Sequence, residues 1–282
     1  MDFSDQLNLL RVHPYLSSYK QKKVVIKYGG AAMLDDGLMR KTVDNISLLV
    51  NSGVLCIIVH GGGPFINTWL EKMNIEPDFK NGIRVTNSQT MQIVQMVLAG
   101  QVNKNIVSLL NTTNVNAIGI SGQDAQLLMA SSDNPDASSN VGRIEVVNSE
   151  VLDVFLKYNY VPVVAPIGAD TFGISYNINA DTVAGAVASS VGADVLIMLT
   201  DTPGILTQPQ DPSTVLTTVR SRTVEKLIEN RIVTGGMIPK LKACLDALNH
   251  GVKTAKILDG RVPNALLKSF DNATLTGSVV SL

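Results

Sequence analysis

Short runs of almost uninterrupted apolar residues recur along the chain and are separated by longer segments with a helical pattern. The first two runs span 24–26 and 54–59, and neither alternates between apolar and polar side chains. Continuous apolar strands are covered on both faces, which is typical of a parallel sheet with helical crossovers. Further runs of this kind span 115–120, 161–165, 195–199 and 254–258.

The alternation of these runs with helical patterns predicts an α/β fold, a three-layer αβα sandwich with a mainly parallel central sheet. The polar, turn-rich residues 131–142 predict an exposed hairpin tip. No long linker interrupts the pattern, so any two lobes must share one continuous sheet. We expect helices over 87–111, 149–158, 180–191, 221–229 and 237–249.

The composition excludes several classes of function. A formal net charge of −1 over 282 residues gives no electrostatic footprint for nucleic acid or a membrane surface. The 3 histidines and 2 cysteines share no ligand spacing, so we expect no metal held by the protein. Cys56 and Cys244 lie in apolar stretches and are predicted to be buried. Without a signal peptide or a predicted membrane span, we expect a soluble protein in a reducing compartment.

Glycine-rich turns follow the first two predicted strands. The first strand runs into Lys27, Gly29 and Gly30, and the second runs into a triple-glycine turn that includes Gly62 and Gly63. Glycines between a strand and a helix let the backbone approach an anion, which its N–H groups and the helix dipole then bind. Because both turns lie at the carboxyl ends of strands, they indicate a shared anion-binding crevice.

Other uses of such glycines do not fit. A dinucleotide-binding G-x-G-x-x-G pattern would need glycine at position 66, where Ile66 stands, and the G-x-x-x-x-G-K-[ST] pattern does not occur. The triple glycine also resembles the oxyanion loop of lipases, but residues 119–123 lack the final glycine of a G-x-S-x-G elbow. A hydrolase is therefore disfavoured.

Further polar residues cluster at the ends of predicted elements. Arg84 has the planar fork that suits a carboxylate. Asn177, Asn179 and Asp181 stand at the start of a helix, where they could cap that helix or face a ligand. Lys240 follows a Gly-Gly turn at a helix N-terminus, where the dipole disfavours a cation, and a bound phosphate would explain it.

Five of these segments resemble the N-acetylglutamate kinases of the amino-acid kinase superfamily, in particular their cyanobacterial and plastid branch. The similarity runs from about residue 20 to about residue 260. The segments Asn-Gly-Ile-Arg-Val-Thr and Asn-Ile-Asn-Ala-Asp separate this family from the aspartate, glutamate, carbamate and uridylate kinases. In this sequence the matching segments are 25–30, 59–64, 81–86, 176–181 and 235–240.

The resemblance implies a role for each matching segment. Lys27 and Lys240 would stabilise the transition state, and Asp181 would hold both lysines in position. Mg²⁺ would be held mainly by the phosphates of ATP. The residues expected to bind N-acetyl-L-glutamate are Gly62, Gly63, Arg84 and Asn177. Those expected to bind ATP are Gly29, Gly30, Thr200, Asp201, Gly204, Ile205, Gly235, Gly236 and Met237.

The expected chemistry is consistent with these residue types. A substrate carboxylate with a pKa of about 4.3 is already ionised at neutral pH, so no general base is needed. The obstacle is bringing that anion to an anionic triphosphate, and positive charge with accurate positioning overcomes it.

The resemblance also implies an organisation of the chain. Residues 1–19 would form an N-terminal oligomerisation helix, 20–180 a lobe for acetylglutamate binding and dimerisation, and 181–282 a lobe for ATP. The protein would be a dimer, or a hexamer built as a trimer of dimers, inhibited by arginine. Residues 259–263 resemble the cyanobacterial and plastid branch, which implies the PII signal protein as a partner and a cytoplasmic or plastid-stromal location.

Two alternatives remain open at this point. The chain could be another amino-acid kinase, acting on glutamate or aspartate, or a catalytically inactive sensor on the same fold. Retention of Lys27, Lys240 and Asp181 argues against the sensor. An NAD-dependent enzyme fits the sequence less well than either of these alternatives.

Overall fold

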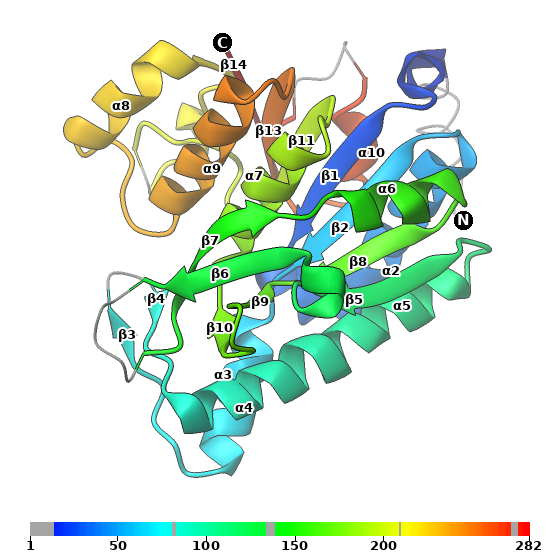
Figure 1. The fold of residues 1–282 in the computed structure, drawn as a ribbon. Coiled ribbons are helices and arrows are strands. Elements are labelled where there is room, and N and C mark those ends of the chain that lie inside the picture. The colour runs from blue at the N-terminus through cyan, green and yellow to red at the C-terminus, as the bar shows by residue number, and fades with distance from the viewer. Residues whose placement is uncertain (1–13, 81–82, 134–138, 209, 272–275) are drawn as a thin grey trace.

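The structure, a computed structural model, describes residues 14–80, 83–133, 139–208, 210–271 and 276–282. Its centre is an 8-stranded sheet with the strand order β12-β14-β13-β11-β1-β2-β8-β5 (Figure 1). The strands span Lys23–Tyr28 (β1), Leu55–His60 (β2), Ala117–Ser121 (β5), Val161–Ala165 (β8), Val195–Thr200 (β11), Thr218–Arg220 (β12), Thr254–Asp259 (β13) and Ser278–Ser281 (β14).

Parallel pairing dominates this sheet, as the continuous apolar runs predicted. Strand β1 lies in the middle, where Val25 is opposite Leu196 of β11 on one side and Ile57 of β2 on the other. The single antiparallel pair joins β13 and β14 near one edge. Every strand predicted from an apolar run is confirmed, and the sheet is continuous across residue 180 as expected.

Helices cover both faces of the sheet, which confirms the three-layer sandwich (Figure 1). Alternate residues of β1 enter different cores, with Ile26 in the cluster on one face and Val25 in the cluster on the other. The first core is closed by α2 (Asp36–Asn51), α3 (Gly63–Lys72), α4 (Ser88–Gln95), α5 (Asn103–Asn111) and α10 (Ala265–Lys268). The second is closed by α6 (Glu150–Lys157), α7 (Ala180–Ser190), α8 (Ser221–Glu229) and α9 (Met237–Asn249).

One long helix crosses the first core. It consists of α4, a π-helical segment η3 (Met96–Val102) and α5, and it matches the predicted helix over 87–111. Ser88–Asn111 is a helix of 24 residues that is long and apolar enough to cross a membrane, so the expectation that no segment reaches that length is wrong. Its apolar side chains, including Ile93, Leu98 and Ile106, pack in the core, and the segment serves here as a core helix.

A smaller 4-stranded sheet, in the order β10-β9-β6-β7, lies beside the main one. Strands β6 (Leu128–Ser132) and β7 (Gly142–Val147) pair antiparallel on either side of the predicted hairpin tip, of which 134–138 lie outside the described residues. Strands β9 (Ile167–Ala169) and β10 (Ser175–Asn177) complete the sheet. The remaining elements are the pair β3 (Phe79–Lys80) and β4 (Ile83–Arg84) and the short 3₁₀ turns η1 (Ser17–Tyr19), η2 (Ala31–Met33), η4 (Asp124–Gln126) and η5 (Pro212–Thr214).

The first described residues already pack against the core. Leu16 is 2% exposed and Tyr19 packs edge-to-face on Phe270, with ring centroids 4.9 Å apart. Most of the predicted N-terminal helix lies outside the described residues. Cys56 and Cys244 are buried as expected, and burial raises the pKa of both thiols.

Candidate active site

The carboxyl ends of the central strands bring the two glycine turns together. Lys27 on β1 is in register with Val59 of β2 and Met198 of β11. The N–H of Gly61 donates to the carbonyl of Tyr28 at 2.8 Å, so the turn after β2 is attached directly to the end of β1. The shared crevice predicted from sequence therefore has a structural basis.

A carboxylate lies between the two predicted catalytic lysines. Oδ1 of Asp181 is 3.0 Å from Nζ of Lys27, and Oδ2 is 2.8 Å from Nζ of Lys240. The contact with Lys240 is also a hydrogen bond, whereas Oδ1 has no hydrogen-bond donor among the described residues and pairs with Lys27 by charge alone. Lys27, Asp181 and Lys240, which are far apart in the sequence, thus form one ion triad.

Burial and charge act in opposite directions on this triad. Lys27 is 7% exposed and Asp181 is 4% exposed. Burial would raise the pKa of Asp181, but the two ammonium groups outweigh that effect and hold its pKa below the ordinary value. Burial lowers the pKa of Lys27, and Asp181 opposes this shift. With two ammonium groups and one carboxylate, the triad retains one positive charge for an incoming anion.

Helices α7 and α9 fix the positions of Asp181 and Lys240. Asn179 caps α7, and its side chain accepts hydrogen bonds from the backbone N–H of Asp181 and of Thr182. One turn into each helix, Gly185 packs on Ala243 so closely that a Cβ on Gly185 would lie 2.8 Å from the carbonyl oxygen of Ala243. The backbone contact between the helices therefore sets the separation of the two charges.

A pocket of about 170 Å³ opens beside the triple-glycine turn. Four residues predicted to bind N-acetylglutamate line it, namely Gly62, Gly63, Arg84 and Asn177. Its other lining residues are Gly61, Ile66, Phe79, Leu98, Pro166, Ile178, Asn179 and Ala180.

Arg84 is the charged group of this pocket. Its side chain is 6% exposed, its Nη2 donates to the carbonyl of Gly63 and to Asn67, and its guanidinium stacks over the ring of Phe79. Nη1 is buried and donates to no described residue. Burial lowers the pKa of Arg84. A buried guanidinium with a free donor fits a bound carboxylate.

The polar residues at the start of α7 divide between the two functions that the sequence left open. Asn179 is the helix cap. Asn177 lines the pocket and donates to the hydroxyl of Thr86, while Asp181 joins the ion triad. Capping and ligand binding therefore both occur in this short segment.

Only part of the predicted nucleotide-binding set lies beside the triad. A Cβ on Gly29 would lie 2.8 Å from Nζ of Lys27, and Gly30, with φ of 78°, lies against Asp201. Thr200 donates from Oγ1 to Asp201. These residues surround the end of β1 on the side of β11.

The other predicted nucleotide residues are placed differently. Ile205 is 0% exposed, and its N–H and the neighbouring Gly204 lie against the hydroxyl of Ser278, so the side chain of Ile205 belongs to the core. Gly235 and Gly236 are exposed and precede Met237, the first residue of α9, three positions before Lys240.

Sequence reasoning missed two buried polar residues beside the glycine turn. His60 and Asn103 are both 0% exposed, and Nε2 of His60 lies 3.1 Å from Nδ2 of Asn103. The available signals were a histidine closing an apolar strand and an asparagine inside an apolar helix.

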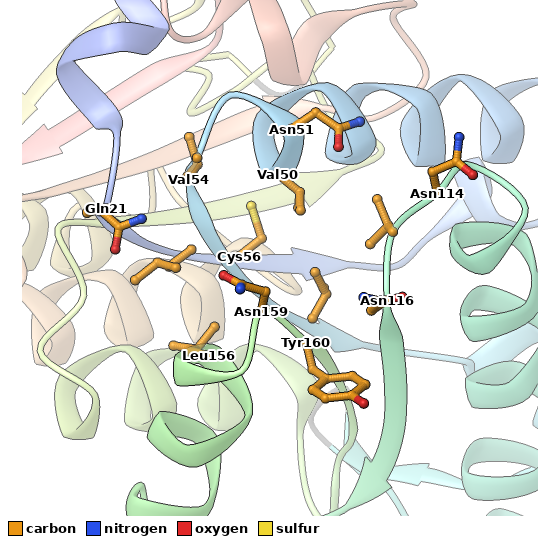
Figure 2. Close-up of a pocket in the computed structure, with 14 residues that line it drawn as sticks. Gln21, Val50, Asn51, Val54, Cys56, Asn114, Asn116, Leu156, Asn159 and Tyr160 are labelled. Carbon is orange, nitrogen blue, oxygen red and sulfur yellow. The ribbon is translucent and has the colours of Figure 1, made fainter.

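A second cavity, of about 290 Å³, lies at the opposite, amino-terminal ends of β1, β2, β5 and β8. Figure 2 shows its lining, in which amides such as Asn51, Asn114, Asn116 and Asn159 surround a floor that includes Cys56. No charged side chain lines it, whereas the pocket at Arg84 has the charge that anion chemistry requires. The described residues contain no cluster of His, Cys, Asp or Glu able to hold a metal ion.

Comparison with known sequences agrees with this geometry. The model of the Amino acid kinase family matches residues 22–259. Acetylglutamate kinase of Nostoc punctiforme is 49% identical over 254 residues, which cover 90% of this chain and 85% of that protein. Acetylglutamate kinase of Gracilaria tenuistipitata var. liui is 45% identical, with 95% of each chain covered.

Solved structures agree on the fold. The carbamate kinase from Giardia lamblia bound to AMP-PNP superposes with a TM-score of 0.70 at 15% identity. The alignment covers 93% of this chain and 98% of that chain.

Proposed function

Because this chain belongs to the amino acid kinase family, we propose that it phosphorylates the γ-carboxylate of N-acetyl-L-glutamate with ATP. The product would be N-acetyl-L-glutamyl 5-phosphate, formed in the second step of arginine biosynthesis. The observation that carries this proposal is the ion triad of Lys27, Asp181 and Lys240 beside the pocket at Arg84. Relatives named acetylglutamate kinase, at 45–49% identity over most of the chain, support the choice of substrate.

The pocket holds the substrate at both ends. The free Nη1 of Arg84 binds the α-carboxylate, and the amide of Asn177 binds beside it. The γ-carboxylate then lies at Gly62 and Gly63, at the N-terminus of α3, where backbone N–H groups favour negative charge.

The triad lowers the electrostatic barrier between two anions. ATP supplies the phosphoryl group, and the excess positive charge of the triad offsets part of the negative charge of its phosphates. Lys27 and Lys240 hold the negative charge that spreads over the transferring group, and Asp181 keeps their Nζ atoms in place. The donor set is cationic, so Mg²⁺ would be held by the phosphates of ATP rather than by the protein.

Assembly and regulation form a further part of the proposal. We expect a homo-oligomer, a dimer or a trimer of dimers, inhibited by arginine and able to bind the PII protein, in the cytoplasm or the plastid stroma. The contact of Tyr19 with Phe270 supports regulation, since it joins the N-terminal segment to the C-terminal segment. The proposed lobes 20–180 and 181–282 meet where β1 pairs with β11.

Formation of ADP that depends on N-acetylglutamate tests the activity directly. The expected result is turnover with N-acetylglutamate and none with glutamate or aspartate, with the acyl phosphate trapped by hydroxylamine as a hydroxamate. Turnover of glutamate or aspartate instead would assign another amino-acid kinase, and no turnover of any acid would leave a sensor. Millimolar arginine in the same assay tests inhibition, and a flat response would refute it.

A further inference from the structure

The imidazole of His60 is held at both nitrogens. His60 is the last residue of β2 and is 0% exposed. Its Nδ1 lies 2.8 Å from the carbonyl oxygen of Gly61, and its Nε2 lies 3.1 Å from Nδ2 of Asn103. Because a carbonyl oxygen only accepts hydrogen bonds, Nδ1 must carry the hydrogen.

Asn103 fixes the tautomer from the other side. Its Nδ2 also lies 2.9 Å from the carbonyl oxygen of Val163 and 3.3 Å from that of Ile120, and its Oδ1 accepts from Lys104, so the NH₂ group faces the two carbonyls and the ring. Nε2 of His60 is therefore an acceptor and carries no hydrogen. Burial lowers the pKa of His60 to about 4, and the neighbouring Lys104 acts in the same direction, so the ring stays neutral at physiological pH.

The ring thereby determines the direction of one peptide group in the glycine turn. The structure has no cis peptide, and the C=O and N–H of a trans peptide point in opposite directions. With the carbonyl of Gly61 directed to the buried ring, the N–H of Gly62 points away from the ring, and both glycines line the pocket at Arg84. Among the described residues, no group accepts a hydrogen bond from that N–H.

A glycine peptide needs such a restraint. Glycine adopts many backbone conformations with little energetic preference, so the peptide between Gly61 and Gly62 could rotate and turn its carbonyl toward the substrate. An oxygen there would repel the carboxylate and the phosphates that the pocket must accept. The N–H of Gly61 donates to Tyr28, which holds the peptide between His60 and Gly61. The contact of His60 with the carbonyl of Gly61 holds the next peptide, between Gly61 and Gly62.

Two neighbouring elements, β5 and the π-helical segment η3, accommodate the contact between His60 and Asn103. A Cβ on Gly119 of β5 would lie 1.9 Å from Oδ1 of Asn103, so only glycine leaves room for the amide. Asn103 directly follows the π-helical segment Met96–Val102, a distortion that often accompanies a functional site. In the same segment, Leu98 packs against Gly62.

We infer that His60 is a positioning residue for phosphoryl transfer: in the Nδ1–H tautomer selected by Asn103, it aims the N–H of Gly62 at the reacting anion. The role in transfer rests on the proposed kinase activity, whereas the tautomer does not. A fixed N–H donor stabilises charge that develops in the transition state, and removal of one such donor lowers kcat by about 10²-fold.

The tautomer can be tested without an activity assay. Long-range ¹H–¹⁵N NMR of the side chain should show a protonated Nδ1 and a bare Nε2 in His60, unchanged from about pH 5.5 to about pH 8.5. A hydrogen on Nε2, or titration of the ring in this range, would overturn the inference. If the wild-type protein turned over no N-acetylglutamate, the proposed function would fail while this result stood.

The role in transfer is tested by two matched amide variants. His60→Asn places an N–H donor near the position of Nδ1 and should keep kcat within about fivefold of wild type, whereas His60→Gln places its amide toward Asn103 and should lower kcat about 10²-fold. The KM of N-acetylglutamate should change less than about threefold in both, because the contact strengthens in the transition state. Equal losses of kcat in the two variants would contradict the inference.

Thermal unfolding of both variants separates positioning from folding, since a merely structural role would change stability and kcat together. Gly119→Ala provides an independent test if neither His60 variant folds. It displaces the amide of Asn103, and neither Gly119 nor Asn103 lines the pocket, so it should lower kcat and release the Nδ1–H tautomer. Retention of both would overturn the inference.

Discussion

The Nζ of Lys27, near the end of the central strand, lies 3.0 Å from Oδ1 of Asp181, in the first turn of α7. This contact joins the sheet to the helical layer at the point where the proposed phosphoryl transfer occurs. Since Lys240 occupies the other oxygen, one carboxylate holds two cations that would otherwise repel each other.

Asp181→Asn should therefore impair catalysis most at high pH. Asp181 raises the pKa of Lys27 against the effect of burial, so its removal lowers that pKa further and neutral Lys27 accumulates at a lower pH. We expect kcat to fall about 10²-fold near neutral pH and its alkaline limb to move to lower pH. A pH–rate profile measures both, with the exposed Asp246→Asn in α9 as the control. An unshifted alkaline limb would contradict the role of Asp181.

Lys240→Ala should lower kcat far more than it raises either KM. Its ammonium is held on Asp181 at 2.8 Å and would act on charge in the transition state, so we expect a loss of about 10²–10³-fold in kcat. Lys242→Ala, two residues further along α9 and exposed, should leave steady-state kinetics unchanged. Near-normal kcat in Lys240→Ala would remove the lysine from the mechanism.

Gly29→Ala should act through Lys27. The added Cβ would lie 2.8 Å from Nζ of Lys27, so the ammonium must move away from its place beside Asp181. Displacement of a catalytic group by about 1 Å can lower the rate about 10²-fold. Gly100→Ala is the matched control, because an added Cβ there meets nothing within 4 Å. The idea fails if both variants have the same kcat.

Lys256→Met should stabilise the fold. Lys256 is 8% exposed, donates to the carbonyl of Ser269, lies over the ring of Phe270, and has no carboxylate partner among the described residues. Burial lowers its pKa to about 8. The unfolded chain therefore holds a proton that the folded chain lacks between that value and the ordinary pKa of about 10.4.

The sign of this linkage makes stability rise with pH across that window, by up to about 3 kcal/mol from this group. Urea unfolding at about pH 7 should show a gain of about 1–3 kcal/mol in Lys256→Met, and the rise toward pH 10 should shrink. The exposed Lys253→Met should change stability by less than about 1 kcal/mol. A loss of stability in Lys256→Met would show that the buried ammonium contributes more than it costs.

Much of the fold could be predicted because its strands are buried on both faces. The run 195–199 carries its own signal, since every position of β11 is buried. The 4-stranded sheet gave no such signal, because no position of β7 is buried and β9 and β10 are only 3 residues long. Their pairing depends on long-range contacts that local patterning does not encode.

The sequence predicts which charged residues are candidates for the site, and it is less informative where burial decides the role of a residue. The family resemblance predicts that Lys27, Asp181 and Lys240 act together, and in the structure both lysines contact Asp181. The sequence does not show which asparagine caps α7, because that depends on the backbone geometry at Asn179. His60 could not be assigned from sequence, because its partner Asn103 lies 43 residues away and their contact depends on the packing of α5 against β5.

The contact of Gly185 with Ala243 bears on how such a chain could change over evolution. A single methyl group at position 185 would force α7 and α9 apart, since the nearest atom that it meets is backbone. The charges of Asp181 and Lys240 would separate, and the pocket at Arg84 would change as well, because Asn179 and Ala180 at the start of α7 line it. One small substitution outside the site could thus stop phosphoryl transfer in a chain that keeps all of its charged residues.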